Sequence, residues 1–167
     1  PTAGERQVRA LLGLGPLPGE DTTEDTAPVF REVVQVAEAF AVSRQRIYQN
    51  LAKHRARWVD AAGIEDLLDA VREVLDAADG VCTVADAAAE LARRHGAGED
   101  EELPAAFALV RIAADLRAVL GDDAPVVLGR IHDQAWLAHE QETLDALRTI
   151  ARSADRLAGE GEIAATG

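Results

Sequence analysis

Apolar residues recur at helical spacing in successive short blocks of this sequence, and glycine, proline or serine separates each block from the next. In the most regular block, from Ile64 to Ala78, apolar side chains return every three or four residues and therefore share one face of a helix. The blocks are rich in alanine, glutamate and arginine, which favour helix, and only 4% of all residues are aromatic. The sequence therefore predicts a mostly α-helical protein.

Breaks and capping residues set the limits of the predicted elements. Ser43 and Thr83 are good N-cap residues, and Gly63 and Gly96 are expected to end elements. The run 126–138 holds two short extended stretches around a polar turn and predicts a β-hairpin. Helices are predicted over about 4–12, 28–40, 43–58, 64–78, 84–94, 104–120 and 141–158, with a frayed end after the last.

The formal net charge of −13 is distributed unevenly along the chain. Residues 1–62 contain eight acidic and eight basic side chains, so the whole negative excess falls on residues 63–167. Such asymmetry indicates different partners for the two parts. Three helices followed by a hairpin is also the order of elements in a winged-helix domain. We therefore predict a helix-turn-helix domain over 1–62 and an acidic winged-helix-like domain with a small β-hairpin and a C-terminal helix over 63–167.

The segment from Ser43 to Trp58 carries five positive side chains and no negative one. Preceded by a short helix and a tight break, it has the proportions of the second helix of a helix-turn-helix, which enters the major groove of DNA. At 100° per residue, Ile47, Leu51 and Trp58 share the core side of this helix. The opposite face carries small and amide side chains with cations on its flank, which suits base edges and phosphates. Its members are Gln45, Gln49, Ala52 and Ala56, flanked by Arg46, Lys53 and Arg57.

The stretch "SRQRIYQNLAK", residues 43–53, resembles the recognition helix in region 4 of sigma-70-type factors. That pattern is Ser/Thr-Arg-x-Arg-Ile/Val-x-Gln-x-x-Ala-Lys, and the sequence departs from the usual residues of the family at Gln45, Tyr48 and Asn50. The resemblance implies that Arg44, Gln45 and Gln49 contact bases. It implies phosphate contacts by Arg46 and Lys53, and we expect Ser43 and Arg57 to join them.

Longer parts of the chain are similar to the non-kinase region of the PglW family. These parts are "GERQVRALLGL", "AEAFAVSRQRIYQNLAKHRARW", "LLDAVREVLDAADGVCTVADAAAELARRHG" and "TLDALRTIARSADRLA". PglW proteins are large serine/threonine kinases of Pgl and type 2 BREX phage-defence systems, in which a sigma-region-4-like module precedes a HARE-HTH-like winged segment. The resemblance implies that this chain is a fragment of a larger bacterial protein. The sequence contains no Gly-rich loop, no His-Arg-Asp loop and no Asp-Phe-Gly motif, so we expect no kinase activity in it.

Other functional classes have little support in the sequence. The histidine spacings match no zinc pattern, and no nucleophile–base arrangement is evident, so we expect no enzyme activity, cofactor or metal site. A single cysteine, Cys82, fits a reducing compartment, and no apolar run is long enough for a membrane span. We therefore expect a cytoplasmic protein without membrane contact.

Two alternatives to DNA binding remain open at this point. Both parts of the chain could form a protein–protein interaction module, in which the basic helix docks on an acidic partner. The chain could also be a piece of a sigma-like transcription factor that contacts RNA polymerase. Because phosphate repels the acidic region 63–167, we expect a protein partner for that region and duplex DNA for the basic helix.

Overall fold

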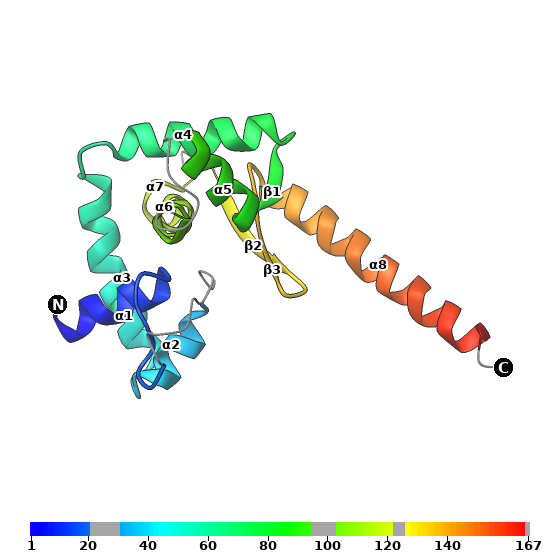
Figure 1. Cartoon of the computed structure of the whole chain (residues 1–167), viewed down its shortest axis with the longest axis horizontal. Coiled ribbons are helices and arrows are strands. Elements are labelled where there is room, and N and C mark those ends of the chain that lie inside the picture. Colours follow the sequence, from blue (N-terminus) through cyan, green and yellow to red (C-terminus); the bar gives the residue numbers. More distant parts are fainter. Residues whose placement is uncertain (21–30, 95–102, 122–125, 166–167) are drawn as a thin grey trace.

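The computed structural model describes residues 1–20, 31–94, 103–121 and 126–165. The protein is mostly helical, as predicted, with one small antiparallel sheet of three strands (Figure 1). In chain order its elements are α1 (Ala3–Leu11), α2 (Val33–Ala39), α3 (Arg44–Val59), α4 (Ile64–Ala77), β1 (Val81–Thr83), α5 (Val84–Arg94), α6 (Leu103–Asp115), α7 (Arg117–Leu120), β2 (Val127–Ile131), β3 (Gln134–Ala138) and α8 (Gln141–Ala165).

The first three helices pack around their own apolar core. Val8 and Leu11 of α1 meet Val36 of α2 and the predicted core residues Ile47 and Leu51 of α3, all of them buried. The start of α1 is held by a capping box, in which the Thr2 hydroxyl accepts from the backbone N–H of Glu5. This core fixes which side of α3 is turned inward.

A tight turn of four residues, 40–43, joins α2 to α3. The backbone N–H of Val42 donates to the Ala37 carbonyl at 2.9 Å, and that of Ala41 donates to the Glu38 carbonyl at 3.0 Å. These two bonds and the positive φ of 52° at Ala41 form a Schellman motif, which satisfies the last carbonyls of α2. Ser43 then caps α3, since its hydroxyl accepts from the backbone N–H of Arg46 at 3.2 Å. The predicted break and cap are confirmed.

A second core lies between the sheet and helices α4, α5 and α6. The strand order is β1-β3-β2, with Cys82 opposite Leu137 and Leu128 opposite Leu137. Side chains alternate across the strands, so these three residues point into the core with α4, α5 and α6. The predicted hairpin is confirmed, and Val81–Thr83 adds a third strand that is too short to show a strand pattern in the sequence.

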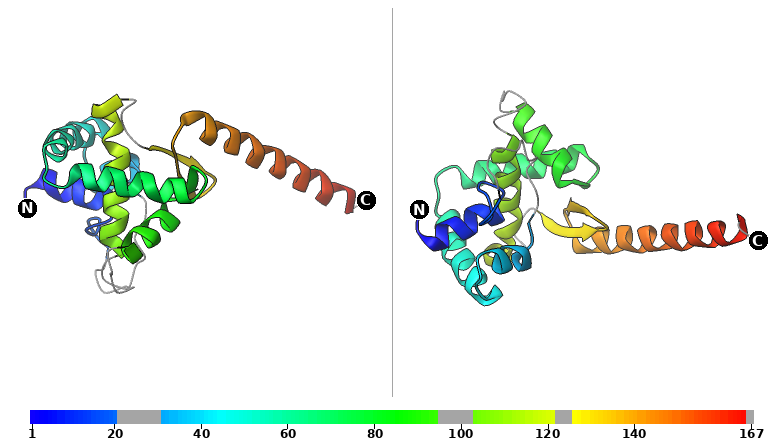
Figure 2. Two further views of the ribbon diagram at one scale, coloured as in Figure 1. Left: turned by 90° about the horizontal axis from the view of Figure 1, so that it is seen from above. Right: turned by 60° about the horizontal axis from the view of Figure 1, so that its bottom comes forward.

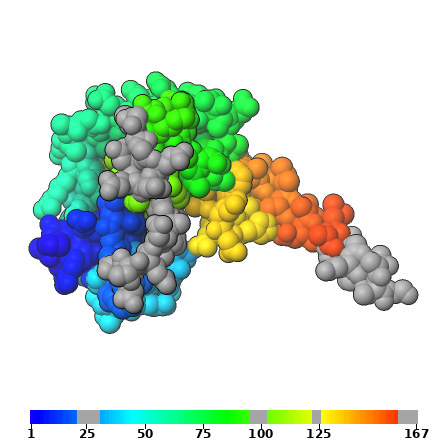
Figure 3. Space-filling model, in the orientation of Figure 1, coloured from blue at the N-terminus to red at the C-terminus, as the bar shows by residue number. Residues whose placement is uncertain are grey.

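The opposite face of the sheet packs against the beginning of α8. Buried Leu144 meets Val127 and Ala138 there, with Trp136 partly buried beside them. Gly129 permits this close approach, because a Cβ at its position would lie 2.8 Å from Leu144 Cδ1. Beyond this contact α8 runs away from the rest of the molecule, as both views of Figure 2 and the space-filling view in Figure 3 show.

Helix α6 lies in the middle of the molecule, between α3 on one side and α4 and α5 on the other (Figure 1). Its Ala108 and Ile112 belong to the apolar core of α1–α3, whereas Val110 and Ala113 belong to the second core. At its end, the buried Asp115 carboxylate accepts from Arg55 of α3 at 3.1 Å and from Arg111 at 3.3 Å. This carboxylate joins the two parts of the chain.

Three predicted helix limits differ from the structure. Helix α2 begins at Val33 rather than near Pro28, which lies outside the described residues. The predicted helix 104–120 is divided at Leu116 into α6 and α7. Helix α8 continues to Ala165, past the predicted end at Ala158, because no proline interrupts it and each glycine weakens a helix by only about 1 kcal/mol.

We predict that Asp115→Asn lowers the free energy of unfolding by about 3–5 kcal/mol, because it removes the buried carboxylate that two largely buried guanidinium groups share. The matched control is Asp69→Asn, which removes an exposed carboxylate paired with Arg72 and should change stability by less than about 0.5 kcal/mol. Urea unfolding followed by circular dichroism measures both. Equal small effects would show that the buried carboxylate does not hold the two parts together.

Candidate nucleic-acid interface

Helix α3 has one buried side and one exposed side. Ile47 and Leu51 are 0% and 1% exposed, and Trp58 is partly buried against the same core. All seven side chains predicted to contact DNA lie on the exposed part of the helix or at its cap, namely Ser43, Arg44, Gln45, Arg46, Gln49, Lys53 and Arg57. The structure therefore brings them together on one exposed surface, which we call the α3 surface.

The centre of the α3 surface consists of exposed amide and small side chains. Gln45 and Gln49 are exposed one turn apart, followed by the exposed methyl groups of Ala52 and Ala56. An amide with small neighbours can approach the edge of a base closely and hydrogen-bond to it in a bidentate manner. The Ser43 hydroxyl accepts a bond from the backbone as the N-cap, which leaves its own proton free to donate.

The cations of the α3 surface have no acidic partner among the residues that the structure describes. Arg44, Arg46, Lys53 and Arg57 form no ion pair with any residue in the described ranges. Arginines elsewhere in the chain commonly pair, as in Arg72–Asp69, Arg93–Glu90 and Arg148–Asp145. Four positive charges without countercharges make the α3 surface attractive to an anionic partner.

The fifth cation of the basic segment has another role. Arg55 is only 18% exposed and donates to Asp115, so it belongs to the contact between α3 and α6. Its Nε is buried and has no partner among the described residues. Nothing in the local sequence indicated this role, because its partner lies 60 residues away.

Asn50 also has a structural role that sequence reasoning missed. Its side chain is buried and donates to the Gln7 side chain of α1 at 2.7 Å. Gly4 makes room for it, because a Cβ at Gly4 would lie 3.2 Å from three atoms of the Asn50 side chain. The departure from the sigma pattern at this position thus fastens α1 to the buried side of α3.

A groove runs beside the start of α3, where α2 and α3 face strand β2. We call it the junction groove; it has a volume of about 400 Å³ and is lined in part by Glu32, Arg44, Tyr48, Arg111, Leu128 and Arg130. Arg130 donates to Glu32 at 2.8 Å across this groove. The groove therefore brings cations of both parts of the chain to the edge of the α3 surface.

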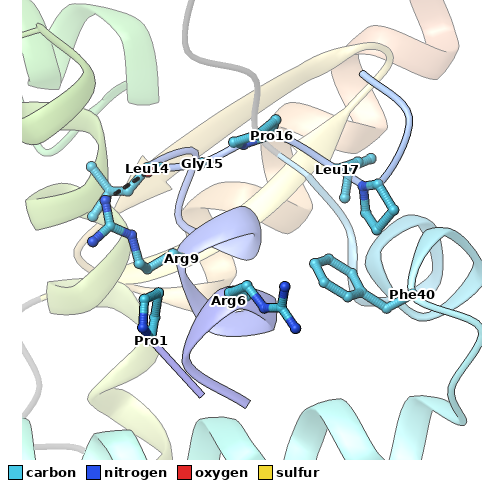
Figure 4. Close-up of a pocket in the computed structure, with 9 residues that line it drawn as sticks. Pro1, Arg6, Arg9, Leu14, Gly15, Pro16, Leu17 and Phe40 are labelled. Atoms are coloured by element: carbon cyan, nitrogen blue, oxygen red, sulfur yellow. Dashed lines mark hydrogen bonds between the residues drawn. The ribbon is translucent and has the colours of Figure 1, made fainter. Parts of the chain in front are cut away.

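A second hollow, of about 520 Å³, lies between α1, the loop after it and the end of α2. Figure 4 shows its two sides, with Phe40 facing Leu17 on one and with Arg9, which donates to the Leu14 carbonyl at 3.2 Å, on the other. Its lining is mainly aliphatic and aromatic, with Arg6 and Arg9 as the cations. The described residues that line it include no acidic side chain, cysteine, serine or histidine.

The described part of the chain gives little support to metal binding or to a membrane-spanning helix. No three histidine, cysteine, aspartate or glutamate side chains gather there to hold a metal ion. Burial, with a smaller effect of Arg57, lowers the pKa of His54, whose ring packs against Trp58 with centroids 5.9 Å apart. Within the same ranges no helix has the length and apolar character to cross a membrane.

No protein-family model matches this sequence, and neither curated proteins nor solved structures give a significant match. The α3 surface is therefore the feature from which we infer a function.

Cys82 should be inert in the folded protein. It is 8% exposed, and burial, with a smaller effect of Asp86, raises the pKa of its thiol to about 11. Only about one thiol in a thousand is then ionised at pH 8, and the thiolate is the reactive form. We predict that Ellman's reagent modifies Cys82 rapidly in urea and at least a hundred times more slowly without it. Equal rates would show that the second core does not cover this side chain.

Proposed function

We propose that this chain binds duplex DNA through the α3 surface, as a DNA-binding fragment of a larger bacterial cytoplasmic protein. The observation that carries the proposal is the exposure of all seven predicted contact residues on one side of α3, with four cations unpaired within the described ranges. From the sequence resemblance, we propose a phage-defence serine/threonine kinase of the PglW family as the parent protein.

The arrangement of α2 and α3 supports a helix-turn-helix mode of binding. A four-residue turn joins them, and the N-terminal part of the second helix is exposed, as is required of a helix whose first turns enter the major groove. The Gln45 and Gln49 amides can hydrogen-bond to adenine edges, and the Arg44 guanidinium can hydrogen-bond to a guanine edge. Arg46, Lys53 and Arg57 lie beside them in position for phosphates.

We assign a different role to residues 63–167. The order α4-β1-α5-α6-β2-β3 and the sheet order support a winged-helix-like module, in which α6 takes the place of the recognition helix. Here α6 is packed between α3 and α5, and its residues Ala108, Arg111 and Ala113 are buried. A helix covered on both sides cannot enter a groove of DNA, so α6 acts as a support for α3.

A protein partner is the second candidate function, and α8 favours it for the acidic module. Ile150 and Leu157 are 64% and 68% exposed on the part of α8 that projects from the molecule. Large apolar side chains at such exposure are typical of helices that bind another protein surface. RNA polymerase is one partner of this kind, by analogy with sigma factors.

The test is fluorescence anisotropy of the chain with a labelled random duplex over a range of salt concentrations. Because 1–62 has no net charge, we expect weak binding that falls steeply with salt. Each phosphate contact contributes about −0.9 to the slope of log K against log salt, so Arg46→Ala with Lys53→Ala should make the slope shallower by about 1.8.

The matched control carries Arg72→Ala and Arg152→Ala, which remove the same charge from exposed arginines of α4 and α8. For this control, the slope of log K against log salt should equal that of the unaltered chain. An equal loss in both double variants would show that only net charge matters. No binding at low salt would contradict DNA binding and favour a protein partner for the basic helix.

A further inference from the structure

Helix α3 has a second flank, on which the proposed DNA contacts use only Arg44. At 100° per residue, Arg46, Lys53 and Arg57 lie on one side of the line through Gln45 and Gln49. Arg44, Tyr48 and Arg55 lie on the other side of that line. Only the first of these flanks has been given a phosphate, since Arg44 has been assigned to a base edge.

A helix in the major groove lies between two phosphate backbones. The groove is about 12 Å wide, so a helix within it has one strand along each flank. If the first flank contacts one strand, the second flank faces the other strand. The structure shows what is available there: Arg55 is bound to Asp115, whereas Arg44 and Tyr48 line the junction groove, where Tyr48 is 53% exposed.

The junction groove adds a cation from a distant part of the chain. Arg130 of β2 lies 98 residues from Glu32 in sequence, yet its NH1 donates to Glu32 Oε1 at 2.8 Å. Both side chains are partly solvent-exposed, at 41% and 45%, so an incoming anion can reach this pair. Arg111 also lines the groove, but it is buried and already bonded to Asp115 and to the Arg31 carbonyl.

We propose that the junction groove binds a phosphate of the second DNA strand, held by Arg44 and Arg130 with the Tyr48 hydroxyl as a further donor. In this arrangement Arg44 contacts the phosphate in place of a guanine edge. This inference rests on the proposed function, since the phosphate belongs to the duplex that α3 enters. Glu32 holds Arg130 in place in the free protein and competes with the phosphate for it. The acidic module thereby supplies one cation to the DNA interface of the first module.

The same anisotropy titrations with a random duplex test the groove. Arg130→Gln should weaken binding and Glu32→Gln should strengthen it, with Arg130→Lys as the control that keeps the charge. Arg130→Gln removes one phosphate contact, so the slope of log K against log salt should become shallower by about 0.9. Arg130→Lys keeps the charge and should retain the slope. Glu32→Gln removes the closer of the two carboxylates paired with Arg130, the other being Asp133 at 3.8 Å, and should tighten binding about two- to five-fold, the factor that an exposed ion pair accounts for. Thermal unfolding confirms that each variant is folded.

Glu65→Gln is the control for the loss of a negative charge, because Glu65 is exposed on α4, away from the groove. It should leave the affinity nearly unchanged.

The groove proposal is overturned if Arg130→Gln keeps the full slope while the Arg46→Ala, Lys53→Ala variant loses part of it. Inorganic phosphate can be added as a competitor of the duplex. The proposal is also overturned if phosphate weakens duplex binding by the unaltered chain but not by Arg130→Gln, while both bind the duplex equally well without it. The groove would then hold only a small anion. Failure of the unaltered chain to bind any duplex overturns the proposed function and this inference together.

Discussion

The Asp115 carboxylate determines how the two parts of the chain are placed. It lies between Arg55 of α3 and Arg111 of α6, and all three side chains are largely buried. A carboxylate between two guanidinium groups is strongly favoured over any arrangement that separates them in a nonpolar environment. This contact, together with Ala108 and Ile112 in the first core, holds α6 against α3. The face of α3 that carries Gln45 and Gln49 stays exposed.

One consequence is that α3 and α6 differ in exposure. In residues 63–167 the helix that precedes the hairpin is α6, and it is enclosed by its neighbours. The helix that stays exposed is α3, which carries unpaired cations in a chain whose net charge is −13. Nucleic-acid affinity depends on local positive charge as well as net charge, so an acidic chain can bind DNA through one basic helix, with modest strength and strong salt dependence.

Local sequence patterns predicted most of the helices and the hairpin, because apolar periodicity and capping residues act over a few residues. Ser43 and Thr83 cap their helices as expected, each through its hydroxyl. What the sequence did not reveal depends on contacts between distant segments: β1 exists because it pairs with β3. Likewise, Arg55 is one of the five cations of the basic segment, and its bond to Asp115 has no sign in the local sequence. Asn50 is a similar case, since its partner Gln7 lies on another helix.

The candidate site shows the same limit. The seven residues predicted on α3 share one surface because a single helix carries them all, so periodicity was sufficient to group them. The junction groove could not be foreseen, because Arg44 and Arg130 meet there only through the packing of α3, α6 and the hairpin. Residues that act together across two modules become visible only when the modules are placed relative to each other.

The central claim is that duplex DNA lies on the exposed side of α3. The most direct test is a ¹H–¹⁵N NMR titration of the chain with a short random duplex at low salt, which follows every backbone and glutamine side-chain amide. We predict that the largest changes in chemical shift occur at residues 43–57 and at the Gln45 and Gln49 side chains, with a smaller set around Arg130. Changes concentrated on α8 or on the acidic helices α4 and α5, with α3 unaffected, would contradict it.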